Sequence, residues 1–337
     1  MKAWIYTSYG GADRLRLTDV PVPAPAADEV LVRVVSVSLN GSDAEALRGS
    51  PAYARLGGLR RPRRQTLGSD IAGTVEAAGA GVTRFAPGDR VFGDILDRLG
   101  GLAEFARARE STLAVIPEGM SFDEAAALPQ GGVIALQGIR DAGGVRPGQR
   151  VLVNGAGGSA GSFAVQFAHV AGAEVTAVDS AAKHDLLREL GADSVLDYAT
   201  EDFSRGDRKY DLVFDVFARR SAPGYLRALA PGGSLLFVGG PVRRMLGLLL
   251  AGLATRPLLR RRLRLLVVRP RLADLLEVAR ALGEGRIRVP VGHLLDFDDV
   301  PYGFRLLLTG KARGKVVVRV APDARAPIEE AGGIGWL

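Results

Sequence analysis

The sequence contains no cysteine among its 337 residues. This absence excludes disulfides, thiolate nucleophiles and thiolate metal ligands. Apart from the carboxylates, the possible metal ligands are His169, His184 and His293. We therefore expect neither a structural nor a catalytic zinc ion.

We also expect no secretory leader. Lys2, Thr7 and Ser8 interrupt the first ten residues before an apolar signal core could form. We predict a cytoplasmic protein.

Acidic residues are absent from one long stretch. The net charge is +7, and the stretch Pro241 to Ala273 holds nine arginines and no acidic residue. Such a patch could bind nucleic acid, anionic lipid or an acidic ligand. It lacks the interleaved aromatic side chains that stack on bases, so we do not expect a nucleic-acid partner. Solubilising charge is the simplest interpretation of these arginines.

The length is too great for one ordinary compact core and suits two domains. Apolar residues make up 47% of the chain, as in a folded protein. Alternate valines in Glu29 to Ser38 predict a half-buried strand, and glycine-rich turns recur between Gly49 and Gly101. Residues 1–120 are therefore predicted to form a β-rich lobe.

From Ser121 onward, helical patterns alternate with short apolar strands. Ser121 and Glu124 form a capping-box pattern at the start of the first helix. The predicted helices and strands cover Phe122 to Leu128, Arg150 to Val153, Phe163 to Val170, Glu174 to Val178, Lys183 to Leu190 and Asp211 to Phe214. This alternation predicts right-handed crossovers and a doubly wound parallel sheet over residues 121–289.

The alternation ends near Val289. The β-branched run Lys315 to Val320 suits a strand that returns to the first lobe, so residues 290–320 are assigned to that lobe. The nucleotide domain is then an insertion. Residues 321–337, rich in alanine, proline and glycine, are expected to form a loose tail.

A glycine-rich turn joins the strand Arg150 to Val153 to an apolar helix. The spacing is Ala156-x-Gly158-x-x-Gly161, with Ser159 and Ala160 between the glycines. Glycines allow a tight turn and close approach of a pyrophosphate, while the helix N-terminus supplies free N–H groups. The sequence therefore predicts a dinucleotide site.

The next strand ends in an acidic residue. Asp179 lies about 20 residues beyond the turn, where it would accept hydrogen bonds from the adenine ribose, with Ser180 beside it. Asp179 would repel a 2′-phosphate, whereas Lys183 could bind one, so NAD is only slightly favoured over NADP. The alternative is a glycine turn in another α/β fold, with Asp179 as a helix cap.

Together these features resemble the medium-chain dehydrogenase/reductase superfamily, in its zinc-independent quinone oxidoreductase-like branch. The resemblance covers about residues 1–320. Besides the glycine turn, four segments carry it: Val37-Ser-Leu-Asn-Gly-Ser-Asp43, Leu67-Gly-Ser-Asp-Ile-Ala-Gly-Thr-Val-Glu76, Phe85-Ala-Pro-Gly-Asp-Arg-Val-Phe-Gly93 and Arg313-Gly-Lys-Val-Val-Val318. The resemblance implies a GroES-like catalytic domain with an inserted Rossmann-type domain, alcohol dehydrogenase-like in architecture.

The resemblance also implies which side chains act on substrate. Asn40 and Ser69 stand where zinc-dependent relatives keep metal ligands, which favours reduction of a quinone or enone over alcohol oxidation. Ser42 stands where zinc-dependent relatives keep a hydroxyl group that relays a proton from the substrate, although it could equally cap a turn. Asn40 could polarise the same substrate oxygen. Asp43 suits a structural role at a helix start, and Tyr53 could donate a proton.

Three further cofactor contacts follow from the resemblance. The backbone at Gly239 and Gly240, after the strand Ser234 to Val238, is expected near the nicotinamide. Lys315 is expected on the cofactor phosphates, the alternative being a solvated charge at a strand end.

The chain departs from the family pattern at two places. Ile134 replaces a threonine near the nicotinamide. Ser159 and Ala160 replace the usual glycine and valine of the turn.

The apolar stretch Met245 to Leu259 is interrupted by Arg256 and Pro257, so it is too short to span a membrane. We expect a helical flap over the substrate cleft or at a subunit interface; an interfacial helix on anionic lipid is the alternative. As a flap it would imply a bulky apolar substrate. Arg243, Arg244 and Arg260 to Arg262 could then attract an anionic one.

The sequence thus predicts a zinc-independent NAD(P)H-dependent oxidoreductase of quinones, enones or related carbonyls. Ile134 keeps open a non-redox cyclase or lyase on the same fold. The arginine-rich insertion keeps open a non-catalytic protein that binds a membrane or a partner. A homodimer is expected by resemblance.

Overall fold

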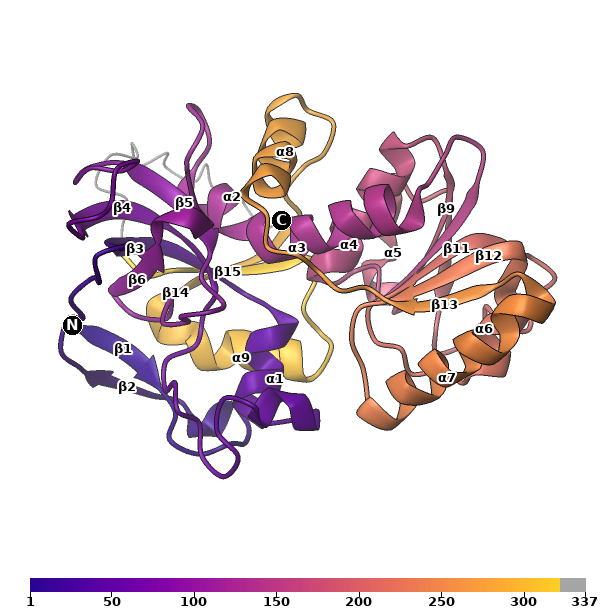
Figure 1. Ribbon diagram of the computed structural model, residues 1–337, viewed down its shortest axis with the longest axis horizontal. Helices are drawn as coiled ribbons and strands as arrows, with labels where there is room; N and C mark the ends of the chain where they lie inside the picture. Colours follow the sequence, from indigo (N-terminus) through magenta and orange to yellow (C-terminus); the bar gives the residue numbers. More distant parts are fainter. Residues whose placement is uncertain (322–337) are drawn as a thin grey trace, which may run out of the picture.

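The computed structural model describes residues 1–321, apart from the side chains of residues 256–259. The chain forms two lobes joined side by side (Figure 1). The predicted loose tail lies outside the described residues.

The first lobe is a strongly curved, mainly antiparallel β structure. Its strands are β1 (Lys2–Ile5), β2 (Arg16–Asp19), β3 (Glu29–Leu39), β4 (Asp70–Ala78), β5 (Arg90–Asp94), β6 (Phe105–Arg109), β7 (Leu113–Val115), β14 (Val291–Asp296) and β15 (Lys315–Arg319), and its helices are α1 (Gly41–Arg48) and α9 (Val300–Leu308). In the described part of the chain, the main sheet has the order β14-β15-β3-β4-β5-β7, with β6 also pairing with β3.

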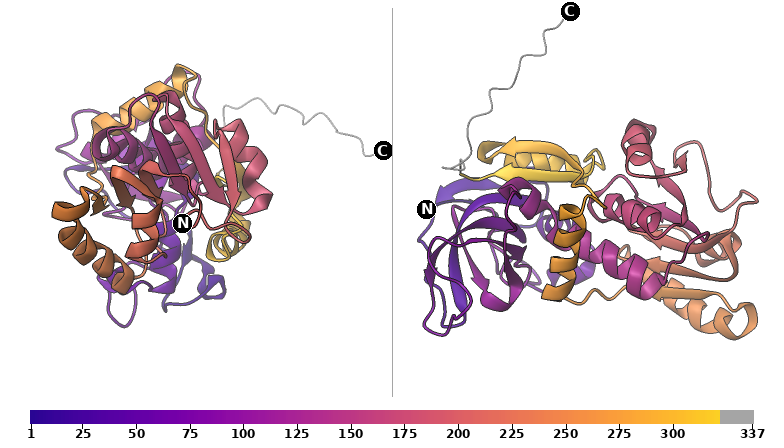
Figure 2. Two further views of the ribbon diagram at one scale, coloured as in Figure 1. Left: turned by 90° about the vertical axis from the view of Figure 1, so that its right-hand side faces the viewer. Right: turned by 90° about the horizontal axis from the view of Figure 1, so that it is seen from above.

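The late strands return to this lobe as predicted. β15 pairs antiparallel with β3, so that Val316 lies opposite Leu39. Figures 1 and 2 show the yellow C-terminal segment lying against the indigo and purple N-terminal lobe. The nucleotide domain is therefore inserted between two parts of one sheet.

β3 differs from its prediction. It was expected to be half-buried, but ten of its eleven residues are buried. The alternate valines Val30, Val32 and Val34 pack in the core of the first lobe, whereas Val35 on the other face joins the core of the second. Both faces of β3 are covered because it lies where the lobes meet.

The second lobe is a doubly wound parallel sheet, as predicted. Its strands are β8 (Arg150–Asn154), β9 (Glu174–Asp179), β10 (Ser194–Asp197), β11 (Tyr210–Asp215), β12 (Leu229–Phe237) and β13 (Arg262–Leu265). In the described residues they take the order β10-β9-β8-β11-β12-β13, with every pair parallel. The helices are α4 (Ser159–Val170), α5 (His184–Glu189), α6 (Ala222–Ala228) and α7 (Val242–Leu259). In Figure 1, α4 and α5 cover one face of the sheet, and α6 and α7 the other.

Three more helices connect the lobes: α2 (Phe122–Ala127), α3 (Pro129–Leu136) and α8 (Leu272–Gly283). The predicted capping box is present, since Ser121 Oγ accepts from the Glu124 N–H and the Glu124 carboxylate accepts from the Ser121 N–H. α2 packs on β3 and β4 of the first lobe, while α3 packs on α4 and α8. The change of lobe therefore occurs between α2 and α3.

The apolar insertion forms α7, a helix along the outer edge of the second lobe, beside β13. Among the described residues, no helix combines the length and hydropathy needed to cross a bilayer.

Candidate functional site

The glycine turn follows β8 and leads into α4, at the carboxyl end of the parallel sheet. The first helical hydrogen bond runs from Ser162 N–H to Gly158 O, so the N–H groups of Ser159, Ala160 and Gly161 have no partner within the helix. A Cβ at Gly161 would lie 2.1 Å from Gly155 O, whereas one at Gly158 would meet nothing closer than 3.5 Å. Gly161 keeps the turn tight, and Gly158 leaves open the space that a diphosphate requires.

The remaining residue predicted in the turn has a backbone role. Ala156 is fully buried, and its N–H donates to Val178 O at the end of β9. This bond ties the turn to the neighbouring strand.

Asp179 ends β9 as predicted, but its carboxylate is already occupied. Its oxygens accept from Gly157 N–H at 2.8 Å and Ser180 N–H at 2.9 Å, and the Lys183 ammonium lies 3.1 Å away. Asp179 and Lys183 are both buried. The acid and the base predicted to compete for the ribose 2′ position thus neutralise one another beneath the turn.

Asn40 links the two lobes just below α4. Its Oδ1 accepts from the Ser159 hydroxyl at 3.2 Å and from Lys315 Nζ at 2.9 Å. Its side chain also hydrogen-bonds to Asp70, and this bond opposes the rise in the pKa of that buried carboxyl. Asn40 is buried and is held by partners from both lobes.

Lys315 was expected to contact the cofactor phosphates or, alternatively, to be a solvated charge at a strand end. The structure shows neither environment. Its ammonium is fully buried, 3.3 Å from Asp70 Oδ2, and Asp70 is fully buried as well. The lysine is neither solvated nor presented to a phosphate, because the pairing of β15 with β3 carries it inside the first lobe. The predicted direct phosphate contact is corrected to a structural ion pair that positions Asn40.

Two more carboxyl groups interact with this ion pair. Burial raises the pKa of Asp43 to about 6, although its carboxylate accepts from Asn40 N–H and Gly68 N–H. Burial, reinforced by Asp70 and Asp43, raises the pKa of Asp94 to about 8. For Lys315 itself, burial lowers the pKa. The structural role expected for Asp43 at the start of α1 is confirmed.

Ser42, in the first turn of α1, donates to Gln130 Oε1 at 2.8 Å. Gln130 opens α3, and its N–H donates to the Asp70 carboxylate. Ser69 is fully buried beside this group and accepts a long 3.5 Å bond from Gln130 Nε2. Gln130 was not predicted, because its place beside Ser42 depends on how α3 crosses between the lobes.

Tyr53 reaches from the first lobe to the second. It lies in a short 3-10 helix, Ala52–Arg55, and its hydroxyl donates to the Glu45 carboxylate at 3.0 and 3.1 Å. A Cβ at Gly239 would lie 3.6 Å from this hydroxyl, and Tyr53 also receives a backbone hydrogen bond from Gly240. The structure thus brings together three residues predicted separately.

Glu45 was not predicted. Burial raises its pKa, and burial together with the Glu45 charge raises the pKa of Tyr53 to about 12. The sequence contained one indication of a role for Glu45. It lies three residues after Ser42, a spacing that places the two side chains on neighbouring turns of α1.

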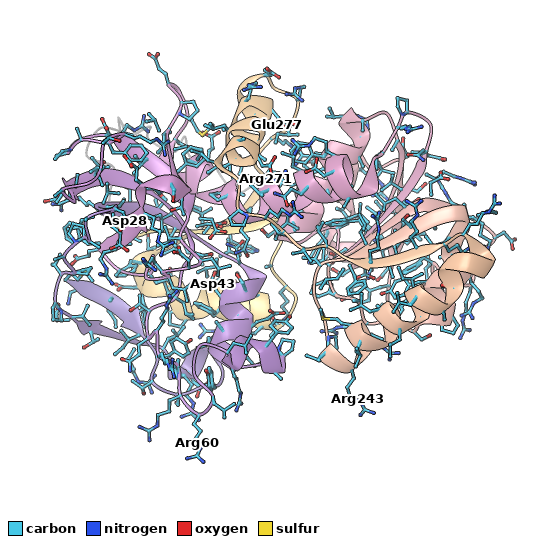
Figure 3. The ribbon with its side chains drawn as sticks, in the orientation of Figure 1. Asp28, Asp43, Arg60, Arg243, Arg271 and Glu277 are labelled. Atoms are coloured by element: carbon cyan, nitrogen blue, oxygen red, sulfur yellow. The ribbon has the colours of Figure 1, made fainter. Side chains whose placement is uncertain are left out.

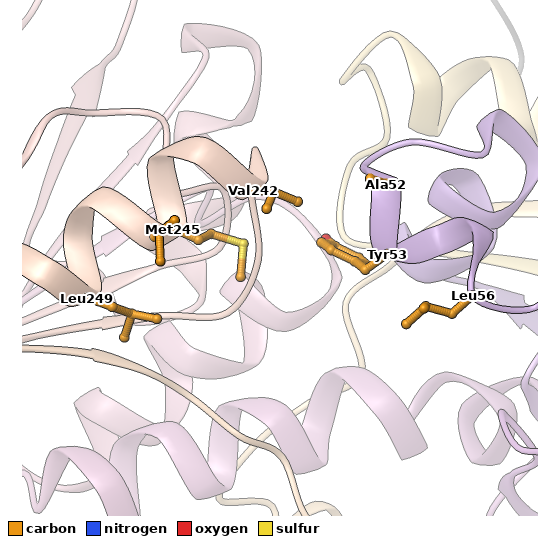
Figure 4. Close-up of a pocket in the computed structure, with 7 residues that line it drawn as sticks. Ala52, Tyr53, Leu56, Val242, Met245 and Leu249 are labelled. Atoms are coloured by element: carbon orange, nitrogen blue, oxygen red, sulfur yellow. The ribbon is translucent and has the colours of Figure 1, made fainter. Parts of the chain in front are cut away.

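An apolar pocket of about 480 Å³ adjoins Tyr53. Its walls come from the 3-10 helix and from α7, which face one another across the cleft (Figure 4). The residues lining it are Ala52, Tyr53, Leu56, Val242, Met245, Leu246 and Leu249. The helix predicted to be a flap, α7, therefore forms one wall of this pocket, and Tyr53 contributes the polar group, its hydroxyl.

Ile134, the residue that replaces the threonine of the family pattern, is partly buried on α3 and packs against the core of the second lobe. Among the described residues, no cluster of three or more histidine, aspartate or glutamate side chains is arranged to hold a metal ion.

The comparisons with known proteins agree with this architecture. The alcohol dehydrogenase GroES-like domain matches residues 26–137, and the zinc-binding dehydrogenase family matches residues 190–318. A tomato (Solanum lycopersicum) 2-methylene-furan-3-one reductase is 34% identical over 335 residues, which cover 96% of this chain and 80% of the relative.

Two further relatives have names that bear on chemistry. The chloroplastic NADPH-dependent alkenal/one oxidoreductase of Arabidopsis thaliana is 35% identical over 257 residues, covering 72% of this chain and 63% of the relative. The solved structure of the quinone oxidoreductase from Coxiella burnetii superimposes with a TM-score of 0.84 at 27% identity, covering 95% of this chain and 99% of that one.

Proposed function

This chain belongs to the medium-chain dehydrogenase/reductase superfamily, in its quinone oxidoreductase and alkenal/one reductase branch, and we propose that its substrate is a bulky apolar quinone or enone held beside Tyr53. It is an NAD(P)H-dependent reductase of quinones, alkenals or enones. The observation that carries the substrate proposal is the apolar pocket between α7 and the 3-10 helix, with a tyrosine hydroxyl at its wall. A pocket of this kind fits an acceptor with one polar oxygen and an apolar body.

The residues of the turn fit the coenzyme. Gly158 and the N–H groups of Ser159 to Gly161 would hold the diphosphate, Ser180 and the Asp179–Lys183 pair would lie by the adenine ribose, and Gly239 and Gly240 by the nicotinamide. When bound, the reduced nicotinamide supplies a hydride. The protein contributes alignment and exclusion of water from the cleft.

Tyr53 and Glu45 are proposed to deliver the proton. With a pKa of about 12, Tyr53 stays protonated near neutral pH and can donate a hydrogen bond to the acceptor oxygen. For this transfer the O–H that points to Glu45 in the free protein turns to the acceptor oxygen. Once Tyr53 has given up its proton, Glu45, whose pKa is raised by burial, can take a proton from solvent and pass it to the tyrosinate oxygen. The role of Asn40 in polarising the substrate oxygen stays a prediction.

We expect Tyr53→Phe to lower kcat for an enone about 10 to 100-fold, within the usual range for loss of a positioned proton donor. Steady-state kinetics under saturating coenzyme would measure it. The coenzyme Kd should stay unchanged, because the ring and its apolar contacts remain. Glu45→Gln should lower kcat less. Because the Glu45 charge then no longer raises the pKa of Tyr53, the loss of activity at alkaline pH should begin at a lower pH than in the parent chain. If Ser42→Ala lowers kcat more than Tyr53→Phe does, the Ser42 hydroxyl is the donor instead.

Coenzyme preference should respond to the buried pair of Asp179 and Lys183. In the unchanged chain the two charges cancel, so both coenzymes are expected to bind, with NADH slightly favoured. Asp179→Asn removes the negative charge and leaves Lys183 free for a 2′-phosphate, so the ratio of Kd for NADH to Kd for NADPH should rise about tenfold. Lys183→Ala should move this ratio the other way. Equal ratios in both variants, measured by fluorescence titration, would contradict this assignment.

Reduction itself is tested by mixing the protein, either reduced coenzyme and a panel of quinones and enones in the presence of a metal chelator. Loss of absorbance at the nicotinamide band with at least one apolar acceptor is expected. Acceptance of only small polar carbonyls would contradict the substrate proposal and leave the reductase activity intact. Homodimerisation and a cytoplasmic location stay predictions.

A further inference from the structure

Large apolar side chains are exposed on both sides of the cleft mouth. On α7, Leu250 is 58% exposed; across the cleft, Leu56 is 88% exposed and Leu59 78%. Leu246, also on α7, is 56% exposed and lines the apolar pocket together with Leu56. Exposed leucines gathered from two separate segments mark an interaction surface. We call these four leucines the mouth leucines.

Exposed arginines accompany the mouth leucines in both segments. Arg60, Arg61 and Arg63 lie in the loop that carries Leu59, and Arg243 and Arg244 lie in the first turn of α7. Figure 3 shows Arg60 and Arg243 extending from the same end of the molecule, one from each lobe. No acidic residue occurs in residues 46–69 or 216–273. The surface around the cleft mouth is therefore apolar and positively charged.

Helix stability does not account for the arginines of α7. Positive side chains in the first turn face the positive end of the helix dipole, which disfavours them, and that turn contains no acidic residue to offset the charge. The stability of α7 therefore gives no reason for Arg243 and Arg244, which are exposed and available to a negative partner.

We infer that the cleft mouth docks on the surface of an anionic lipid bilayer. Leucines flanked by arginines combine apolar insertion with attraction to anionic headgroups. A second copy of this chain fits less well, because a two-fold contact would bring two positively charged surfaces together. Exposed arginines stand on both sides of the cleft mouth and match a partner that is negative over a wide area: Arg60, Arg61 and Arg63 on one side, and Arg243 and Arg244 on the other.

Docking in this orientation would supply the proposed substrate. Leu56 and Leu246 belong both to the exposed surface and to the pocket wall, so an apolar quinone or enone dissolved in the lipid could enter without crossing water. This second step rests on the proposed function. The docking itself rests only on the exposed side chains.

The test is co-sedimentation of the full chain with vesicles, without coenzyme or acceptor. Vesicles of phosphatidylcholine mixed with phosphatidylglycerol should bind the protein at least about tenfold better than phosphatidylcholine alone, and added salt should weaken this binding. The variant Arg60→Glu/Arg243→Glu should lose at least about tenfold in vesicle affinity. The matched control is Arg146→Glu/Arg280→Glu, which has the same net charge but alters other exposed arginines, Arg280 being on α8 at the opposite side of the molecule. This control should bind like the parent chain.

A second double variant tests whether the mouth leucines insert into the bilayer. Leu59→Ser/Leu250→Ser keeps every charge and should also weaken vesicle binding severalfold. The inference is overturned by equal binding to both vesicle types, by equal losses in the two charge variants, or by no loss in the leucine variant. It is also overturned if the leucine variant changes a dimer into a monomer, because a second copy then covers this surface. Because neither coenzyme nor acceptor is present, failure here leaves the reductase assay unaffected.

Discussion

Gly158→Asp is expected to raise the Kd for NADH and NADPH at least about 100-fold while leaving the fold intact. Gly158 is the N-cap of α4 with an extended backbone (φ −95°, ψ −176°) that any residue adopts. Aspartate is a preferred N-cap, so the melting temperature should stay equal or rise. Its carboxylate would accept from the same N–H groups that we assign to the diphosphate, and would repel that diphosphate.

The neutral variant Gly158→Asn shows whether the charge or the volume of the new side chain lowers the coenzyme affinity. Asparagine occupies nearly the same volume and also caps a helix, so its effect on coenzyme affinity should be clearly smaller than that of aspartate. Gly161 cannot be used in this way, because a Cβ there would collide with Gly155 O and disrupt the turn. Calorimetric titration of both Gly158 variants checks the prediction. Equal affinities in the aspartate variant and the parent chain would place the diphosphate elsewhere.

Lys315→Met is expected to lower the free energy of unfolding by about 3–5 kcal/mol, because it leaves Asp70 buried without its cation. Asp43 and Asp94 also interact with this ammonium, so the ionisable groups that remain beside Asp70 are acidic and cannot replace its cation. The melting temperature should fall by on the order of 10 °C in a thermal scan. Lys315→Met/Asp70→Asn removes both charges and should recover most of the loss.

The destabilisation should depend on pH in a defined direction. Without Lys315, the pKa of Asp70 rises further above its value in the unfolded chain. A carboxyl group whose pKa is raised by folding destabilises the protein when the pH is high enough to ionise it. The difference in stability between the variant and the parent should therefore narrow as the pH falls. A difference that is constant from pH 5 to pH 8 would contradict the ion-pair assignment.

Sequence reasoning predicted the nucleotide lobe best, because its signals are local. The strand ending at Val153, the glycine turn and the helix that follows are contiguous, and each has its own periodicity or conformational requirement. Asp179 was placed correctly at the end of β9 for the same reason. Its pairing with Lys183 could not be predicted, since both groups are single charges whose partners depend on the path of the next turn.

The first lobe was predicted less completely because its contacts are distant in sequence. Lys315 and Asn40 are separated by 275 positions, and only the pairing of β15 with β3 brings them together. Glu45 and Gln130 could not be predicted, because each forms its hydrogen bond with a side chain on another element. Glu45 bonds to Tyr53, and Gln130 bonds to Ser42. Tyr53 was named for its chemistry alone, and its position opposite Gly239 follows from the way the lobes meet.

The central claim is hydride transfer from a coenzyme held at the glycine turn to an apolar acceptor beside Tyr53. The most direct measurement incubates the protein with an enone and NADPH or NADH carrying deuterium at C4, with a chelator present, and locates the label in the product by mass spectrometry and NMR. We predict one deuterium on the carbon β to the carbonyl, from a single face of the nicotinamide. A product without deuterium, or no product with either coenzyme across enones and quinones, would contradict the account.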